Sequence, residues 1–265
     1  YGTTRMRRAC DHTLDRFLHD EIEPLARTIL RLGVWQIIFG GVPAHAAVSA
    51  TVEVAPRRFR GLCNAVLRRI AENPVTDWPS EAIELSYPDW LMNRLKLDVG
   101  EKDALGMAKT MNEPALAVTR SDGYHQDLSS QMVAELAVEG LKEGDSILDL
   151  CAAPGGKSFQ ILAKNNKITL NDINKSRIKR LKKNLDRLNF KTKIYNFDAL
   201  KINSKEKYDF IVIDAPCSSV GTIRKNPEIF FKLKDPNLKN LISVQKNILK
   251  KASTLLNHKG VILYM

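Results

Sequence analysis

Residues 146–157 read Ser146-Ile-Leu-Asp-Leu-Cys-Ala-Ala-Pro-Gly-Gly-Lys157, and this stretch decides the fold. Its opening residues form a short apolar run that is typical of a buried strand. The small residues that follow predict a tight turn, and a helical pattern then continues through Leu162. The stretch therefore predicts the first strand, turn and helix of an α/β domain.

The residues after this unit repeat the alternation of strand and helix. Apolar runs predict strands at 167–170, 193–197, 208–213 and 261–264, and helical periodicity predicts helices at 175–188 and 237–256. Strands that alternate with helices imply right-handed crossovers and a parallel sheet that is covered on both faces. We therefore expect a doubly wound, Rossmann-like α/β domain over residues 129–265.

The residues before it have a helical period instead. An apolar face recurs at steps of three and four residues in one helix, at Leu25, Ile29, Leu32, Trp35, Gln36 and Phe39. Further amphipathic helices are predicted at 44–54 and 59–70. We expect a small all-α domain over residues 1–72. Residues 73–128, with several prolines and two short helical patterns, are predicted to be a connector.

The charge is unevenly distributed along the chain. Residues 1–140 hold 16 Lys and Arg against 19 Asp and Glu, whereas residues 141–265 hold 25 against 11. The net charge therefore changes from −3 to +14 between the two parts. Lysines near phosphates gain affinity by releasing counterions, so this asymmetry favours a nucleic-acid partner. A solvated, Lys-rich surface without such a partner is the alternative.

Cysteine spacing and hydropathy exclude several classes of protein. The chain has four cysteines, at Cys10, Cys63, Cys151 and Cys217. They lie far apart without a CxxC pair or a histidine cluster, so we expect free thiols and no disulfide, zinc site or other metal site. The apolar runs are too short to cross a bilayer, and no leader pattern opens the sequence. We expect a cytoplasmic monomer without a membrane segment.

Acidic residues follow successive predicted strands. Parallel sheets bind ligands beyond the carboxyl ends of their strands, so these residues are the candidate site. Asp172 follows one strand and could accept hydrogen bonds from ribose hydroxyls. Asp198 follows the next and could accept a hydrogen bond from the exocyclic amine of an adenine, and Asp214 follows a third strand. Any one of them could instead cap a helix. The turn at 152–156 lacks the full G-x-G-x-x-G pattern, which argues against a dinucleotide.

Two long strings carry a family resemblance. Asp149-Leu-Cys-Ala-Ala-Pro-Gly-Gly-Lys157 and Asp214-Ala-Pro-Cys-Ser-Ser-Val-Gly-Thr-Ile-Arg-Lys-Asn-Pro-Glu228 resemble the RNA (cytosine-C5) methyltransferase family. Pro43-Ala-His-Ala-Ala-Val48 and Arg60-Gly-Leu-Cys-Asn-Ala-Val-Leu-Arg69 resemble the NusB-like domain of its bacterial small-subunit ribosomal RNA enzymes. The resemblance implies 16S ribosomal RNA as the substrate. It also implies that S-adenosylmethionine is bound by Cys151, Ala152, Ala153, Pro154, Gly155, Gly156, Lys157, Asp172, Asp198 and Asp214.

The implied chemistry explains the catalytic residue types. Carbon 5 of cytosine is a poor nucleophile, so a thiolate first adds to carbon 6 while an acid supports protonation at N3, a role that suits Asp214. A base then removes the carbon 5 proton, and expulsion of the thiolate leaves 5-methylcytosine. In this family the Pro-Cys cysteine, here Cys217, is implied to assist product release. A Thr-Cys pair after the next strand is implied to supply the nucleophile.

The chain departs from the family pattern at three places. Residues 261–265 resemble the start of the strand that precedes the Thr-Cys pair, so the nucleophile is expected beyond Met265. The opening Tyr1-Gly-Thr-Thr-Arg5 resembles an interior point of the NusB-like domain. An RNA-binding insertion is shortened between Arg120 and Tyr124. We therefore expect a fragment that binds the cofactor with weak or absent turnover.

Three other readings remain open. Cys217 is the nucleophile if the chain works as DNA cytosine-C5 methyltransferases do. A catalytically incomplete RNA-binding protein would use the helices and the basic surface alone. A methyltransferase with another target would share the cofactor site, but the Asp214-Ala-Pro-Cys217 string opposes it. Amino-group methyltransferases typically place Asn or Asp before Pro-Pro and an aromatic residue there.

Overall fold

The computed structural model describes residues 1–164, 167–202, 205–232 and 238–265. The chain forms two compact units: Tyr1–Ala115 with Ser219–Asp235, called here the helical unit, and Leu116–Ser218 with Pro236–Met265, called here the sheet unit. In the described part of the chain, no helix is long and apolar enough to cross a membrane. The boundaries predicted at residues 72 and 128 stay a prediction.

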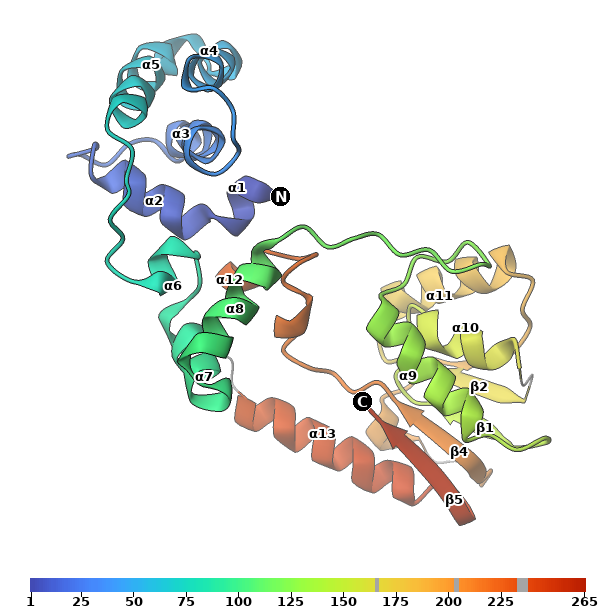
Figure 1. Cartoon of the computed structure of the whole chain (residues 1–265). Coiled ribbons are helices and arrows are strands. Elements are labelled where there is room, and N and C mark those ends of the chain that lie inside the picture. Colours follow the sequence, from blue (N-terminus) through green and yellow to red (C-terminus); the bar gives the residue numbers. More distant parts are fainter. Residues whose placement is uncertain (165–166, 203–204, 233–237) are drawn as a thin grey trace. The chain divides into compact units, whose positions relative to one another are not determined.

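The first part of the helical unit is a bundle of helices (Figure 1). Its elements are α1 (Gly2–Arg5), α2 (Arg7–Asp15), α3 (Pro24–Ile38), α4 (Ala44–Val54) and α5 (Arg57–Glu72). Leu30 and Val34 of α3 and Leu67 of α5 are fully buried in one core cluster. The predicted all-α domain at the start of the chain is confirmed.

The segment predicted as a connector contains further helices with a core of their own. These elements are α6 (Glu81–Glu84), α7 (Asp89–Val99) and α8 (Glu101–Asn112), joined by η2 (Val220–Thr222) and α12 (Ile229–Lys232). The buried ring of Tyr87 lies 4.7 Å from that of Phe230, centroid to centroid. Part of this core comes from more than a hundred residues downstream, so no local pattern in the connector reveals it.

The sheet unit is built around five parallel strands. They are β1 (Ile147–Asp149), β2 (Ile168–Asn171), β3 (Lys193–Tyr195), β4 (Tyr208–Ile213) and β5 (Leu256–Tyr264), in the order β3-β2-β1-β4-β5. Its helices are α9 (Leu128–Glu139), α10 (Gly156–Leu162), α11 (Lys175–Arg187), η1 (Ala199–Lys201) and α13 (Leu238–Ser253). The doubly wound fold is confirmed. The predicted helix start at residue 237 lies outside the described residues.

Alternate strand residues face two different cores. Ile147 and Val212 belong to a cluster with residues of α9, α10 and α11, whereas Leu148 and Ile211 belong to a cluster with residues of α13. Figure 1 shows these helices on the two faces of the sheet. Because successive side chains of a strand point to opposite faces, strands that are apolar throughout require helices on both sides. This packing brings the loops after the strands to one edge.

Candidate cofactor and catalytic site

The predicted site residues follow four neighbouring parallel strands. The segment 151–157 follows β1, Asp172 follows β2, Asp198 lies three residues after β3, and Asp214 follows β4. Register pairs Asp149 at the end of β1 with Leu170 of β2 and with Val212 of β4. The carboxyl ends of these strands therefore share one edge of the sheet, where doubly wound proteins bind their ligands.

The turn after β1 is shaped by its small residues. Ala152 and Ala153 are buried, and the Ala152 N–H donates to the Asn171 carbonyl at 2.8 Å. Gly155 has φ +110°, and a Cβ there would lie 2.0 Å from Cζ of Phe159. Only glycine meets both conditions, because the backbone is left-handed and the ring fills the side-chain space. The turn thus presents backbone rather than side chains to a ligand.

Asp172 is tied into this turn. It is 4% exposed, its Oδ2 accepts from the Ala153 N–H at 3.2 Å, and its Oδ1 accepts from the Asn174 N–H at 2.8 Å. Asp198 is half-buried, and its Oδ1 accepts from the Leu200 N–H at 3.0 Å. Asp198 therefore caps a short 3₁₀ turn, which the sequence offered as an alternative to ligand binding.

Two asparagines that the sequence analysis did not select hold the strand ends together. The Asn171 amide is buried and donates to the carbonyls of Leu150 at 3.0 Å and Phe197 at 3.1 Å. The Asn196 amide donates to the Asp172 carbonyl at 2.6 Å. These bonds connect the loops after β1, β2 and β3. A polar residue at the end of an otherwise apolar strand was the available signal for Asn171.

Arg120 was also missed as a site residue. Its Nη1 donates to the Gly156 carbonyl and to Oε1 of Gln126, both at 2.7 Å, and its guanidinium pairs with Asp122. Nearby, the Tyr124 ring meets the Phe159 ring edge-on at 5.3 Å. The segment in which the family's insertion is expected to be shortened therefore contacts the glycine turn. Nothing in its local sequence pattern predicts that contact.

Asp149 lies beneath the same turn. It is 1% exposed, its Oδ2 accepts from the Ser158 hydroxyl at 2.7 Å, and its Oδ1 accepts from the Cys151 N–H at 3.2 Å. Burial raises the pKa of this carboxyl to about 7, against the opposing effect of these hydrogen bonds. Asp149 therefore links the end of β1 to α10 through a buried hydrogen bond.

The four thiols differ in access. Cys10 and Cys63 are buried, Cys151 is half-buried, and Cys217 is exposed. Burial, followed by the charges of Asp149, Asp172 and Asp214, raises the pKa of Cys151 to about 12. Because the thiolate is the reactive form, Cys151 is a poor nucleophile. Cys217 is the thiol that solvent and a substrate can reach in the described part of the chain.

The end of β4 carries the candidate catalytic pair. Asp214 is exposed and its Oδ2 lies 2.7 Å from Nζ of Lys157 at the start of α10. The Gln245 amide of α13 donates to the Pro216 carbonyl at 2.9 Å, which positions the residue before Cys217. The geometry brings residues 151–157, Asp172 and Asp214 into direct contact. Among the described residues, no hydrogen bond or ion pair joins Asp198 or Cys217 to this group.

The strand ends suit an adenosine-containing cofactor. Carboxylates of Asp172 and Asp198 offer hydrogen-bond acceptors, and the apolar side chains of Ile173 and Phe197 beside them are 66% and 55% exposed. Apolar side chains beside a few placed polar groups are typical of sites that bind such ligands. Among the residues described, no group of three or more His, Cys, Asp or Glu side chains is placed to hold a metal ion.

Comparison with known proteins agrees with this architecture. The family model described as "16S rRNA methyltransferase RsmB/F" matches residues 137–265, and the NusB family model matches residues 1–72. Ribosomal RNA small subunit methyltransferase B of Thermus thermophilus is 31% identical over all of this chain and 72% of its own length. The Shewanella oneidensis protein of the same name is also 31% identical, over 89% of this chain and 68% of its length.

Solved structures show the same fold. The crystal structure of PH0851 superposes with a TM-score of 0.77 at 21% identity, over 98% of this chain and 74% of that one. A methyltransferase homolog protein from Pyrococcus horikoshii gives a TM-score of 0.57 at 20% identity, over 69% and 74%. The chain is shorter than its curated relatives. The cofactor of its methyltransferase domain is S-adenosylmethionine. Taken with the arrangement of the strand ends, these matches establish that the chain belongs to the RsmB/F family of 16S rRNA methyltransferases.

Proposed function

We propose that this chain methylates carbon 5 of a cytosine in 16S ribosomal RNA, using S-adenosylmethionine. The observation that carries the proposal is that the segment after β4 holds an exposed carboxylate, Asp214, and an exposed thiol, Cys217, and that Asp214 contacts Lys157 of the cofactor segment. Family membership supports an RNA methyltransferase, and the Asp-Ala-Pro-Cys string supports the cytosine chemistry. The relatives are named for the small-subunit ribosomal RNA.

The residues have distinct parts in this scheme. The turn at residues 152–156, Asp172 and Asp198 hold the cofactor, which supplies a methyl group on a positively charged sulfur. Asp214 faces N3 of the cytosine and stabilises its protonated form while a cysteine sulfur is bonded to carbon 6. Carbon 5 would then take the methyl group, whose bond to the sulfonium of the cofactor breaks. Removal of the carbon 5 proton then lets the carbon–sulfur bond break and restores the ring. Cys217 assists that release.

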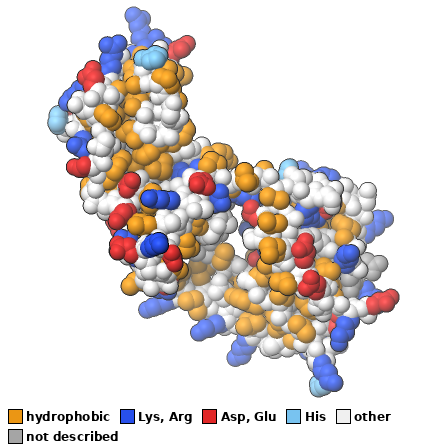
Figure 2. Space-filling model, in the orientation of Figure 1, with side chains coloured by type: hydrophobic (Ala, Val, Ile, Leu, Met, Phe, Trp, Pro, Cys, Tyr) orange, Lys and Arg blue, Asp and Glu red, His pale blue; other side chains and the backbone are white. Residues whose placement is uncertain are grey.

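The RNA must present an unstacked base. Enzymes that act on base carbons take the target nucleotide out of its stack, which favours loops and flipped bases. The net charge of +14 over residues 141–265 supplies attraction for phosphates. On the face shown in Figure 2, however, Lys and Arg side chains are spread over the surface. Charge alone therefore does not mark the RNA path.

The alternative assignment makes Cys217 the nucleophile. Its exposure favours it over the other three thiols, two of which are buried and one of which has a raised pKa. The two assignments share the cofactor site and differ only in what Cys217 does. A single substitution distinguishes them.

The test combines cofactor binding with methyl transfer. Calorimetric titration with S-adenosylmethionine is followed by incubation with labelled cofactor and a cytosine-containing hairpin of 16S ribosomal RNA. Cys217→Ser is compared with Ser219→Ala, a neighbouring exposed position. Methyl transfer that Cys217→Ser abolishes, with no covalent RNA adduct, assigns the nucleophile to Cys217. Binding without transfer supports a cofactor module whose nucleophile lies elsewhere, and absence of cofactor binding refutes the proposed function.

A further inference from the structure

A short hairpin over residues 118–126 lies in the sheet unit, before α9. Its two arms are joined by an antiparallel bridge between Thr119 and His125. Because side chains alternate between the two faces of a strand, Arg120 and Gln126 lie on the face opposite to this pair. Thr119 and His125 are exposed, whereas Gln126 and the Arg120 side chain are each 8% exposed. The hairpin therefore has a solvent face and a buried face.

The buried face contacts the cofactor turn through Arg120. Its Nη1 lies 2.7 Å from both the Gly156 carbonyl oxygen and Oε1 of Gln126. On its other side, the guanidinium pairs with Asp122, whose Oδ1 accepts from Nε at 3.2 Å. A guanidinium is planar and its donors point in fixed directions, so the two flanking acceptors set its plane. The donor toward Gly156 is therefore held in one direction.

The Gln126 amide has one satisfied end and one unsatisfied end. Its Oε1 faces Arg120, and because a guanidinium can only donate, this contact fixes which end of the amide is the oxygen. Its Nε2 is then buried without a hydrogen-bond partner among the described residues. A buried donor without an acceptor lowers stability. Stability alone therefore does not explain this amide, whereas its action on Arg120 gives it a part.

Aromatic packing links the hairpin to the same turn. The Tyr124 ring meets the Phe159 ring edge-on at 5.3 Å, and Phe159 fills the side-chain space of Gly155. A Cβ on Gly156 would lie 3.2 Å from Cε1 of Tyr124 and 3.3 Å from Cδ of Gln126. The hairpin thus packs directly against Gly156 and, through Phe159, against Gly155. In a close-packed interior, a displacement of the hairpin is transmitted to the turn.

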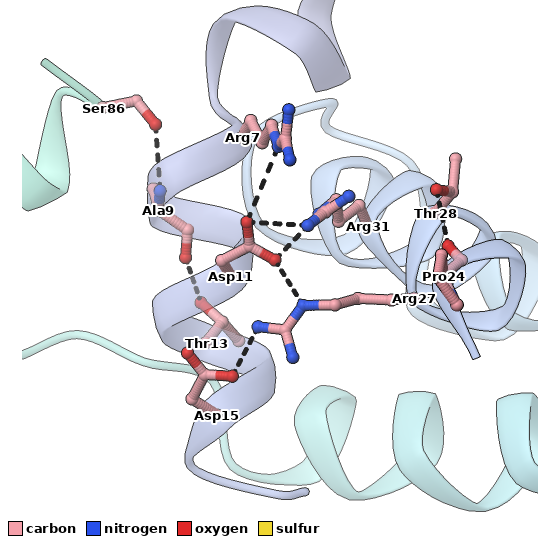
Figure 3. A network of polar contacts seen from close by, with 10 residues as sticks. All are labelled: Arg7, Ala9, Asp11, Thr13, Asp15, Pro24, Arg27, Thr28, Arg31 and Ser86. Carbon is pink, nitrogen blue, oxygen red and sulfur yellow. Dashed lines mark hydrogen bonds and ion pairs between the residues drawn. The ribbon is translucent and has the colours of Figure 1, made fainter. Parts of the chain in front are cut away.

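Arginines with a packing role are arranged differently in this chain. Figure 3 shows Asp11 of α2, whose Oδ1 lies 2.8 Å from Nε of Arg27 and 2.8 Å from Nε of Arg31, both on α3. These ion pairs join the side chains of two helices in the helical unit. Arg120 instead donates to a backbone carbonyl in the turn that follows β1. Arg31 is therefore a suitable comparison for a purely structural arginine.

We propose that Arg120 and Gln126 are positioning residues for the methyl donor, which hold the backbone at Gly156 in the conformation that S-adenosylmethionine binds. They act through the turn and do not contact the cofactor. The next residue, Lys157, pairs with Asp214, so the same contact also steadies the side chain that orients this carboxylate. The inference rests on the part of the proposed function that assigns the cofactor to the turn, and not on the cytosine chemistry.

The test is a calorimetric titration of the full chain with S-adenosylmethionine, at a temperature at which thermal melts show every variant to be folded. A role limited to stability leaves Kd unchanged under these conditions, whereas a positioning role raises it. Arg120→Gln should raise Kd about tenfold, as expected when one charged hydrogen bond no longer holds the turn. Arg120→Lys should also raise Kd, because an ammonium lacks the fixed fork of donors.

Two substitutions of Gln126 separate the contact from the packing. Gln126→Glu keeps an oxygen acceptor for Arg120 and removes the unpaired donor, so Kd should stay within about twofold and the melting temperature should not fall. Gln126→Leu fills a similar volume without an acceptor and should raise Kd about fivefold. Both variants pack a side chain of similar size, so a difference in Kd between them reports the contact with Arg120.

Two matched controls change residues outside the contact. Thr119→Val alters the solvent face of the same hairpin. Arg31→Gln breaks the ion pair with Asp11 and should lower the melting temperature, as Arg120→Gln does. Each control should change Kd for S-adenosylmethionine less than about twofold, because neither touches the turn.

The outcomes separate this inference from the proposed function. Equal Kd values for the wild type, Arg120→Gln and Gln126→Leu would overturn the inference and leave the cofactor site standing. Equal weakening by Arg31→Gln and Arg120→Gln would mean a general effect of lost stability and would overturn it too. If Arg120→Gln does not fold, the two Gln126 variants decide, and equal affinities would overturn it. Absence of cofactor binding by the wild type refutes the proposed function as well, whereas absence of methyl transfer bears only on the cytosine chemistry.

Discussion

Nζ of Lys157 lies 2.7 Å from Oδ2 of Asp214. The contact joins the helix after β1 to the end of β4, and so it connects the two signature strings. The Lys157 side chain is 19% exposed and that of Asp214 is 48% exposed. A pair of this accessibility orients the carboxylate without burying its charge, which leaves Asp214 available to a substrate.

A double-mutant cycle measures this ion pair. Lys157→Met, Asp214→Asn and the double variant should give a coupling of about 0.2 to 1 kcal/mol in the free energy of unfolding, because the pair is partly solvated. Added salt should reduce the coupling. Additive single effects at low ionic strength would show that the contact contributes nothing to folding.

Asp172→Ala should weaken S-adenosylmethionine binding by about 1 to 3 kcal/mol, the cost of losing buried hydrogen bonds. The carboxylate also accepts from the Ala153 and Asn174 N–H groups, so the turn beside the cofactor loses its support. Asp186→Ala removes an exposed carboxylate from α11 and is the charge-matched control. Calorimetry on both variants decides the assignment, and equal affinities would refute it.

Asp149 should make stability depend on pH. Its pKa is raised from 3.8 to about 7 by burial, so the folded state keeps a proton that the unfolded state releases. Stability relative to Asp149→Asn should therefore fall as pH rises from about 4 to about 7. Above that window the difference should stay constant. Chemical denaturation of both proteins across this range is the measurement, and parallel profiles would contradict the raised pKa.

A glycine series tests the turn after β1. Gly155→Ala should destabilise the protein by about 2 kcal/mol or more, because φ is +110° and the new Cβ would overlap the Phe159 ring. Gly100→Ala, at φ +85° with open space, should cost about 1 kcal/mol. Gly221→Ala, with open space and ordinary φ, should be neutral. Thermal melts rank the loss of stability in the three variants. A small loss in Gly155→Ala would mean that the Phe159 ring moves aside.

The segment from Leu116 to Gln126 shows how contacts distant in sequence escape a local reading. The prolines and short helical patterns of residues 73–128 indicated a connector, yet Arg120 in this segment donates to the Gly156 carbonyl and pairs with Asp122. The partner of Arg120 lies 36 residues away, and periodicity reports only neighbours on one element. The Tyr87–Phe230 contact escaped for the same reason.

The sequence by itself determined the fold class, the order of the strands along the chain and most of the helices, because apolar periods and glycine turns are local properties. It placed the end of the last helix and the start of the last strand too late, since α13 ends at Ser253 and β5 begins at Leu256. It also placed Asp172 and Asp214 at strand ends, since parallel strands bring their carboxyl ends together. Only the tertiary structure decided that Lys157 pairs with Asp214 and that burial raises the Asp149 pKa. Each of these depends on distance and desolvation between groups that the chain order keeps apart.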